Sequence, residues 1–557
     1  MQDIGTRAGR ATGAKQRLRA RALLLALGLA GALGAALAHP APPPVTGTAA
    51  VEPAPVQWLA RASASLRASA IEQDELLRLY RAGGHAMRWL DGQGRPSANA
   101  TAALALIEHA AAEGLEPDDY RPEVLAGKPL ADAPEEWDVA LSLGMLRYLR
   151  QLHFGRVDPR TLGFRLPARE HEHDFAAGLD EALRQEQLPA AAQALVPPLA
   201  QYRGLRDALQ RYRAVAAQQA AMGWSGPLPA DAGEAAALSR VRLQALGDLA
   251  PAPLSTDAPG HVPDAALAAA IRRFQIRHGL PPDGKLGTAT RAALDVPPAR
   301  RARQIELAME RLRWLPHLQG RPFIAVNIPM FRLWTWPAAL EMDVIVGRAV
   351  KTQTPVFTED MRYLVFRPYW DVPASILRQE LLPALRRNPS YLARQDMEIV
   401  SGAGDQAQVL PAGPDTLALL ERGLARVRQR PGPKNALGQA KFIFPNDHNV
   451  YLHSTPAPAL FGRSRRDFSH GCIRVQDPVA LAQWVLQDQP SWTRARIEAA
   501  MANDGPLRVD LNRSIPVIVY YVTAAVMPQD GGLHFAEDLY GHDRRLEQWL
   551  QAHQARR

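Results

Sequence analysis

The side chain with the clearest chemical potential in this chain is its single cysteine, Cys472, among 557 residues. It lies in the run Phe468 to Val475, which reads FSHGCIRV. The N-terminus has the pattern of an export signal, and an exported thiol meets an oxidising compartment. Because the chain has no second cysteine, this thiol cannot form an internal disulfide. Retaining it predicts nucleophilic catalysis, with a histidine that takes the thiol proton.

Two histidines are candidates for that base. A thiol with its ordinary pKa of about 8.5 is only a few per cent ionised at neutral pH, so it needs a basic or positively charged neighbour. His453 ends a predicted strand 19 residues before Cys472 and is the expected general base and acid. His470 lies two residues before the cysteine, points away from it if the segment is extended, and is expected to support the loop and its oxyanion site. The carbonyl of Ser454, or of a neighbour, is expected to orient the imidazole of His453.

The loop around the cysteine offers further candidates. Gly471 permits a tight turn, and its N–H and that of Cys472 are expected to face a developing oxyanion, where one donor is typically worth about 10²–10³ in rate. Arg474 either holds the loop through backbone carbonyls, which we favour, or binds a substrate carboxylate. Trp370 and Ser469 are predicted to contact substrate. An acid that completes a triad with the histidine stays open, since three lie nearby: Asp447, Asp467 and Asp477.

The composition excludes several other classes of protein. The net charge is +9, but residues 1–38 carry six basic residues and one acidic residue, which leaves only +4 for the rest. No run of lysine and arginine with interleaved aromatic residues is present, so nucleic-acid binding is not expected. One cysteine, no HExxH spacing and no glycine-rich phosphate motif predict neither a metal nor another cofactor.

The first 56 residues have the pattern of a targeting segment and a linker. Residues 22–38 are 17 uncharged residues after a basic stretch, ending in Ala36-Leu37-Ala38, a small-x-small cleavage site. A cleaved signal peptide in residues 1–38 and an uncleaved anchor in the inner membrane both fit, since 17 residues is the short limit for a span. Either way the body of the chain is expected in the periplasm. A Pro/Ala-rich linker, 39–56, follows.

The rest of the chain predicts a multidomain α+β protein. Residues 57–230 show apolar residues at helical spacing, which predicts an all-α scaffold domain. Residues 235–296 predict a small unit of three helices. From 300 to 545 β-type runs predict a mostly β, sandwich-like catalytic domain. An Arg-rich insertion at about 375–437, bounded by Pro and Gly, is expected to be a lid. Its predicted helices run from Ile376 to Leu385 and from Leu417 to Val427.

His453 together with the run Ser469 to Arg474 resembles the signature of the L,D-transpeptidases, the cysteine enzymes of bacterial cell-wall crosslinking. The segment from Phe274 to Gly287, which contains FQ, HGL and DGKLG, resembles the small peptidoglycan-binding domain, although a helical spacer remains an alternative reading. Together the features resemble the large subfamily with a helical scaffold, a wall-binding module and a capped catalytic domain.

The resemblance implies a reaction on peptidoglycan stem peptides. The thiolate attacks the carbonyl of the third residue of a tetrapeptide stem, D-Ala leaves, and an amine of a second stem resolves the thioester into a 3–3 crosslink. It also implies a role in wall biogenesis and cell shape, and acylation of Cys472 by penem-type β-lactams. Two alternatives stay open: an exported cysteine L,D-carboxypeptidase or endopeptidase, and a non-catalytic peptidoglycan-binding scaffold.

Overall fold

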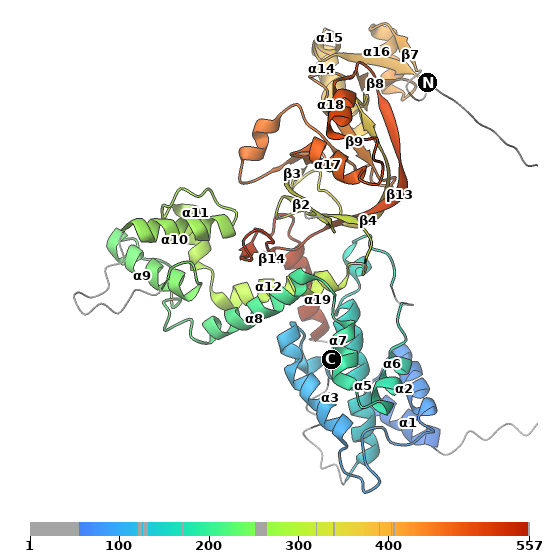
Figure 1. The fold of residues 1–557 in the computed structure, drawn as a ribbon, viewed down its shortest axis with the longest axis vertical. Coiled ribbons are helices and arrows are strands. Elements are labelled where there is room, and N and C mark those ends of the chain that lie inside the picture. Colours follow the sequence, from blue (N-terminus) through green and yellow to red (C-terminus); the bar gives the residue numbers. More distant parts are fainter. Residues whose placement is uncertain are drawn as a thin grey trace, which may run out of the picture. The chain divides into compact units, whose positions relative to one another are not determined.

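A computed structural model of the chain describes residues 55–554, with gaps at 121–124, 126–131, 170–171, 251–263, 319, 338–339, 389, 403 and 405–406. The predicted targeting segment and nearly all of the predicted linker lie outside the described residues. None of the described helices combines the length and the apolar character that a membrane span requires. Figure 1 shows the helices and strands along the chain.

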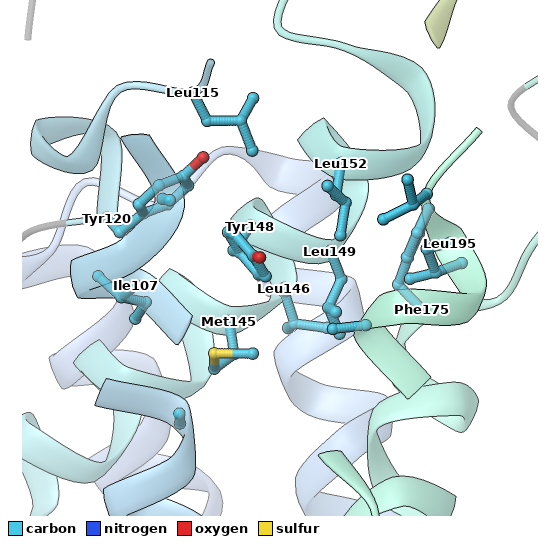
Figure 2. Close-up of a cluster of buried hydrophobic side chains, with 14 of the residues drawn as sticks. Ile107, Leu115, Tyr120, Met145, Leu146, Tyr148, Leu149, Leu152, Phe175 and Leu195 are labelled. Atoms are coloured by element: carbon cyan, nitrogen blue, oxygen red, sulfur yellow. The ribbon is translucent and has the colours of Figure 1, made fainter. Parts of the chain in front are cut away.

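The N-terminal half is helical, as the periodicity predicted. Its centre is α5 (Pro134–Phe154), which is buried on almost every side and therefore carries apolar residues all round. Figure 2 shows part of the surrounding core, in which Met145, Leu149 and Phe175 are buried. The other helical elements of this half are α1 (Pro55–Ser65), α2 (Ala70–Ala82), α3 (Ala98–Glu108), η1 (His109–Glu113), η2 (Pro117–Tyr120), η3 (Pro159–Leu162), α6 (Phe175–Arg184), α7 (Leu188–Leu195) and α8 (Ala200–Ala217).

Three helices, green in Figure 1, follow: α9 (Ala232–Ala245), α10 (Asp264–Arg277) and α11 (Thr288–Asp295). Leu243, Ile271 and Phe274 form their shared core, which is the apolar face that the spacing in α10 predicted. Gln275 is 1% exposed and holds the following loop. Its Nε2 donates to Asp283 Oδ1 at 2.7 Å, and its Oε1 accepts from the N–H of Gly284 at 2.8 Å. The polar residues of this motif thus serve the architecture of the loop.

The third region is built on a sheet of nine strands in the order β11-β3-β12-β10-β9-β4-β13-β1-β2. Because β2 also pairs with β3, the ladder closes on itself. The strands are β1 (Phe323–Asn327), β2 (Arg332–Trp336), β3 (Glu341–Gly347), β4 (Phe357–Phe366), β9 (Ala440–Ile443), β10 (Leu452–His453), β11 (Asp467–Ser469), β12 (Ile473–Val475) and β13 (Leu507–Tyr520). Their neighbours are α12 (Pro298–Arg313), η5 (Pro458–Gly462), α17 (Pro478–Val485), α18 (Arg494–Ala502), β14 (Ala524–Val526), β15 (Leu533–Phe535) and α19 (His542–Gln554).

The insertion contains the expected helices and also a sheet that the sequence did not reveal. The helices are α13 (Ala374–Ile376), η4 (Leu377–Leu381), α14 (Leu382–Arg387), α15 (Tyr391–Arg394) and α16 (Pro414–Glu421). Four strands pair in the order β5-β8-β6-β7: β5 (Trp370–Asp371), β8 (Arg426–Gln429), β6 (Met397–Ser401) and β7 (Gln408–Leu410). A helix predicted to run from Leu417 to Val427 ends at Glu421. Gly423 adopts φ +71°, which reverses the chain, and Val427 then pairs with Ile399 as part of a strand.

Candidate active site

The register of two parallel strands sets the face on which the site lies. On β10 and β12, Leu452 pairs with Ile473 and His453 pairs with Arg474. Leu452 and Ile473 are fully buried in the core of the sheet domain. Because side chains alternate along a strand, His453 and Arg474 project from the opposite face, and so does Cys472, which directly precedes β12. The nucleophile and the base predicted from the sequence therefore lie on the same face of adjoining strands.

His453 is held as a neutral imidazole with a defined tautomer. Its side chain is 4% exposed, and Nδ1 lies 2.6 Å from the carbonyl oxygen of Ser454. A carbonyl only accepts, so Nδ1 carries the proton and Nε2 is the basic atom. Burial, followed by the charges of Arg474 and Lys441, lowers the pKa of His453 to about 3, against the opposing effect of the Ser454 hydrogen bond. At neutral pH this histidine can accept a proton.

Cys472 is held as a neutral thiol. Its Sγ lies 3.5 Å from the carbonyl oxygen of Asn449. Burial raises the pKa of the thiol above its ordinary value, while hydrogen bonds with Tyr451 and the charges of Lys441 and Arg474 oppose this rise. The raised pKa of the thiol and the lowered pKa of the imidazole favour two neutral groups at rest over a preformed pair of thiolate and imidazolium.

The loop before the cysteine is held by its own serine. Ser469 Oγ donates to the carbonyl of Cys472 at 2.5 Å and accepts from the N–H of Gly471 at 3.1 Å. Gly471 has φ +117°, a conformation that favours glycine, and its carbonyl accepts from Thr354 Oγ1 at 2.8 Å. Ser469 is 2% exposed. The structure thus gives Ser469 a role inside the loop, and its contact with substrate stays a prediction.

The same hydrogen bonds bear on the expected oxyanion site. The N–H of Gly471 is engaged by the hydroxyl of Ser469 in this structure. The role of the N–H groups of Gly471 and Cys472 as oxyanion donors stays a prediction.

Two residues of the site face the insertion. His470 Nε2 lies 2.7 Å from Glu380 Oε1, on η4 of the insertion. Trp370, on β5, hydrogen-bonds through its side chain to Tyr451. Trp370 is thus separated from the predicted nucleophile by a single side chain, that of Tyr451. His470 connects the cysteine loop to the insertion. Glu380, 90 residues away from His470 in the chain, had no signal in the sequence.

Arg474 and the nearby acids were left with open alternatives. Arg474 Nε is buried and has no hydrogen-bond partner among the described residues, and both roles considered for Arg474 stay predictions. The Nδ1 side of His453, where the third member of a triad would stand, is occupied by Ser454. The three candidate acids are engaged elsewhere: Asp447 pairs with Arg165, Asp467 pairs with Arg465, and Asp477 caps α17.

Two further residues near the sulfur were missed by the sequence analysis. Tyr451 hydrogen-bonds to Cys472, and the ring of Tyr451 lies 5.7 Å from that of His453. Lys441, on β9, pairs in register with His453. Strand alternation could have indicated both residues. Tyr451 is two residues before His453 and so belongs on the same face, and Lys441 is a charged residue between two buried residues of a strand. No group of three or more His, Cys, Asp or Glu side chains in the described part of the chain could hold a metal ion.

Comparison with known proteins assigns three regions of the chain. Residues 74–209 match a family described as "Scaffold domain", and residues 233–294 match one described as "Putative peptidoglycan binding domain". Residues 321–506 match the L,D-transpeptidase catalytic domain. A protein of Haemophilus influenzae named "Putative L,D-transpeptidase" is 33% identical over 246 residues, which are 43% of this chain and 48% of that protein.

The chain thus spans about half of the length of the curated relative that it matches. The catalytic-domain match contains both His453 and Cys472, and the order of the three matched regions is the order that the sequence predicted. The resemblance drawn from the FSHGCIRV run is confirmed: this chain carries an L,D-transpeptidase catalytic domain.

Proposed function

We propose that the protein is a peptidoglycan L,D-transpeptidase that forms 3–3 crosslinks through a thioester on Cys472. The observation that carries the proposal is the shared face of β10 and β12, where a neutral imidazole and the only thiol of the chain lie within a matched catalytic domain. The tautomer of His453, with its proton on Nδ1, leaves Nε2 as the atom that takes the thiol proton.

The reaction follows from these two groups. As Nε2 of His453 takes the proton, the sulfur attacks the carbonyl of the third residue of a donor stem, and the C–N bond to D-Ala breaks. The imidazolium returns that proton to the leaving amine. A side-chain amine of an acceptor stem then attacks the thioester, and its proton passes through His453 back to the sulfur. The N–H of Cys472 is the donor that remains for the oxyanion in both steps.

The insertion serves as a lid in this proposal. Two contacts support it: His470 with Glu380, and Tyr451 with Trp370. A cover over the thioester would exclude water and so favour an amine acceptor. Arg474, with its buried Nε lacking a partner in the described part of the chain, would receive a carboxylate of the stem.

The wider setting is proposed on the same basis. The peptidoglycan-binding match supports the cell wall as the site of action, and the proposed compartment is the periplasm. Export by residues 1–38, either cleaved or retained as an inner-membrane anchor through 22–38, brings it there. Penem-type β-lactams are expected to acylate Cys472 as substrate mimics.

The decisive experiment incubates the protein with purified disaccharide-tetrapeptide and separates the products by mass. A crosslinked dimer with release of D-Ala supports the transpeptidase. Tripeptide monomer alone would mean a hydrolase, and unchanged substrate would mean a wall-binding scaffold. The variant C472A is expected to form no product and to sediment with purified cell walls as wild type does. Persistent product in C472A would refute Cys472 as the nucleophile.

A further inference from the structure

Three polar side chains form a row across adjoining strands beside the proposed nucleophile. His453 on β10 is paired in register with Lys441 on β9 and with Arg474 on β12. Residues directly opposite one another on adjoining strands project from the same face of a sheet. Lys441 and Arg474 therefore flank His453 on the face that also carries Cys472.

The ammonium group of Lys441 is held over an aromatic ring. Its Nζ lies 3.9 Å from the ring centroid of Tyr451, which is within cation–π range. The carbonyl of Tyr451 accepts a hydrogen bond from the N–H of Ile473 at 3.0 Å, and the side chain of Tyr451 hydrogen-bonds to Cys472. Lys441 is thus fixed against the side chain that contacts the sulfur.

Two groups that can carry negative charge act on Lys441, namely Cys472 and Asp371. Burial lowers the pKa of Lys441, and the charges of Cys472 and Asp371 oppose that change. Asp371 is itself paired with Arg426 at 2.8 Å. Burying an ammonium group costs free energy of desolvation. A favourable interaction with the ionised sulfur of Cys472 would offset that cost for the half-buried Lys441.

The neighbouring cation is placed differently. Burial, and then the charge of Arg348, lowers the pKa of Arg474, whose charge also faces Cys472. Arg348 is exposed on the loop after β3. The titratable and charged groups that act on the sulfur are thus Tyr451, Lys441 and Arg474. His453 lies on the same face, and Asp371 and Arg348 lie next to Lys441 and Arg474.

We propose that the ammonium group of Lys441 stabilises the ionised sulfur of Cys472 directly. A fixed cation, Lys441, and the base His453 would then share the activation of the thiol. The inference rests on the proposed function in one respect, the identity of the nucleophile. When the thiol proton leaves, to His453 Nε2 or to solvent, the negative charge forms on sulfur beside an ammonium group that is already in place. The sequence analysis had assigned this activation to His453 alone.

The test is the pH dependence of Cys472 alkylation by iodoacetamide in the full-length protein, since this reaction reports the ionised sulfur and needs no stem peptide. A close opposite charge typically shifts a pKa by about 1–3 units. K441M is expected to raise the pH midpoint of alkylation by about one unit or more, and so to slow alkylation at pH 7 by about tenfold or more. K441R is expected to restore most of the rate. The matched control is K351M, at an exposed lysine on the loop after β3.

An unchanged midpoint in K441M, with wild-type thermal unfolding, would overturn the proposal. If K441M unfolds early, K441Q gives the same comparison with a polar side chain, and an unchanged midpoint there has the same meaning. Repeating K441M in the H453Q background separates two routes: a persisting shift means that Lys441 acts on the sulfur, whereas its loss means that it acts only through the imidazole and overturns the proposal. Failure of the proposed function would give a different result. The alkylation midpoint would still differ between wild type and K441M, but the wild-type protein would form neither dimer nor tripeptide from disaccharide-tetrapeptide.

Discussion

The motif around Cys472 and the motif around Gln275 each indicated a known family, but their side chains have opposite settings. In the sheet domain, Leu452 and Ile473 fill the core, while His453 and Cys472 lie on the other face with polar neighbours. In the three-helix unit, the amide of Gln275 is turned inward and bonded to its own loop. A motif therefore marks chemistry only where the backbone register leaves its polar atoms on a face that the core does not fill.

The histidines of the two motifs repeat this contrast. His278, of the HGL segment, stacks on Phe274 at 3.8 Å between ring centroids and on Phe535 at 5.4 Å. Burial lowers the pKa of His278 well below its ordinary value. The imidazole of His278 therefore packs as a neutral ring against aromatic neighbours. His453 is more deeply buried, at 4% exposure, and it lies on the sheet face that also carries Cys472. The comparison predicts large chemical effects in one region and purely structural effects in the other.

The largest expected effect is that of H453Q. Glutamine can still donate to the carbonyl of Ser454 but cannot take a proton, so crosslinking should fall by about 10²–10⁴ in kcat. The rate of dimer formation from disaccharide-tetrapeptide measures this loss. H448Q, at a histidine of the nearby turn, is the matched control and should keep the wild-type rate. A rate within threefold of wild type in H453Q would show that another group deprotonates the thiol.

A pH profile of the wild-type protein sharpens the same side of the comparison. Burial raises the pKa of Cys472, and the pKa of His453 is lowered to about 3, so both groups are expected to be neutral at neutral pH. Alkylation by iodoacetamide should therefore rise about tenfold per pH unit across neutral pH, without a plateau. A plateau between pH 5 and 7 would instead reveal a thiolate–imidazolium pair in the resting site.

The other side of the comparison is tested by Q275L. The substitution removes the internal bonds of Gln275, which is 1% exposed, and leaves the part-buried N–H of Gly284 without its acceptor, at a cost of about 1–3 kcal/mol. Hydrogen exchange of peptides from residues 233–294, in the full-length protein, should show the loss of protection. I276Q, at a neighbour that is 52% exposed, should change it by less than about 0.5 kcal/mol. Wild-type protection together with lost cell-wall binding in Q275L would mean that Gln275 faces a ligand, and the contrast would fail.

The sequence was sufficient for the local pattern and insufficient for the pairing between strands. Apolar spacing predicted the helices around α5 and the strands that carry the core, because those patterns depend on near neighbours. The strand at Val427 was read as part of a helix, since its apolar residues follow a helical segment, and only pairing with β6 makes it a strand. Lys441 and Glu380 escaped notice for the same reason: register and a contact across 90 residues place them in the site.

The smallest expected effect concerns the contact between the two halves of the catalytic region. The hydrogen bond of His470 with Glu380 is partly exposed, with side-chain exposures of 31% and 50%, so it should stabilise the closed insertion by no more than about 1 kcal/mol. E380Q should therefore let the insertion open up to about fivefold more often, admit water to the thioester, and raise the ratio of tripeptide to dimer by a few-fold. R378Q, at an exposed residue of the same helix, is the matched control. Water needs only access to the thioester and the base His453 in order to react. An unchanged product ratio in E380Q would therefore mean that the acceptor amine excludes water by occupying the site itself. The contact of the insertion with His470 would then serve only the fold of the cysteine loop.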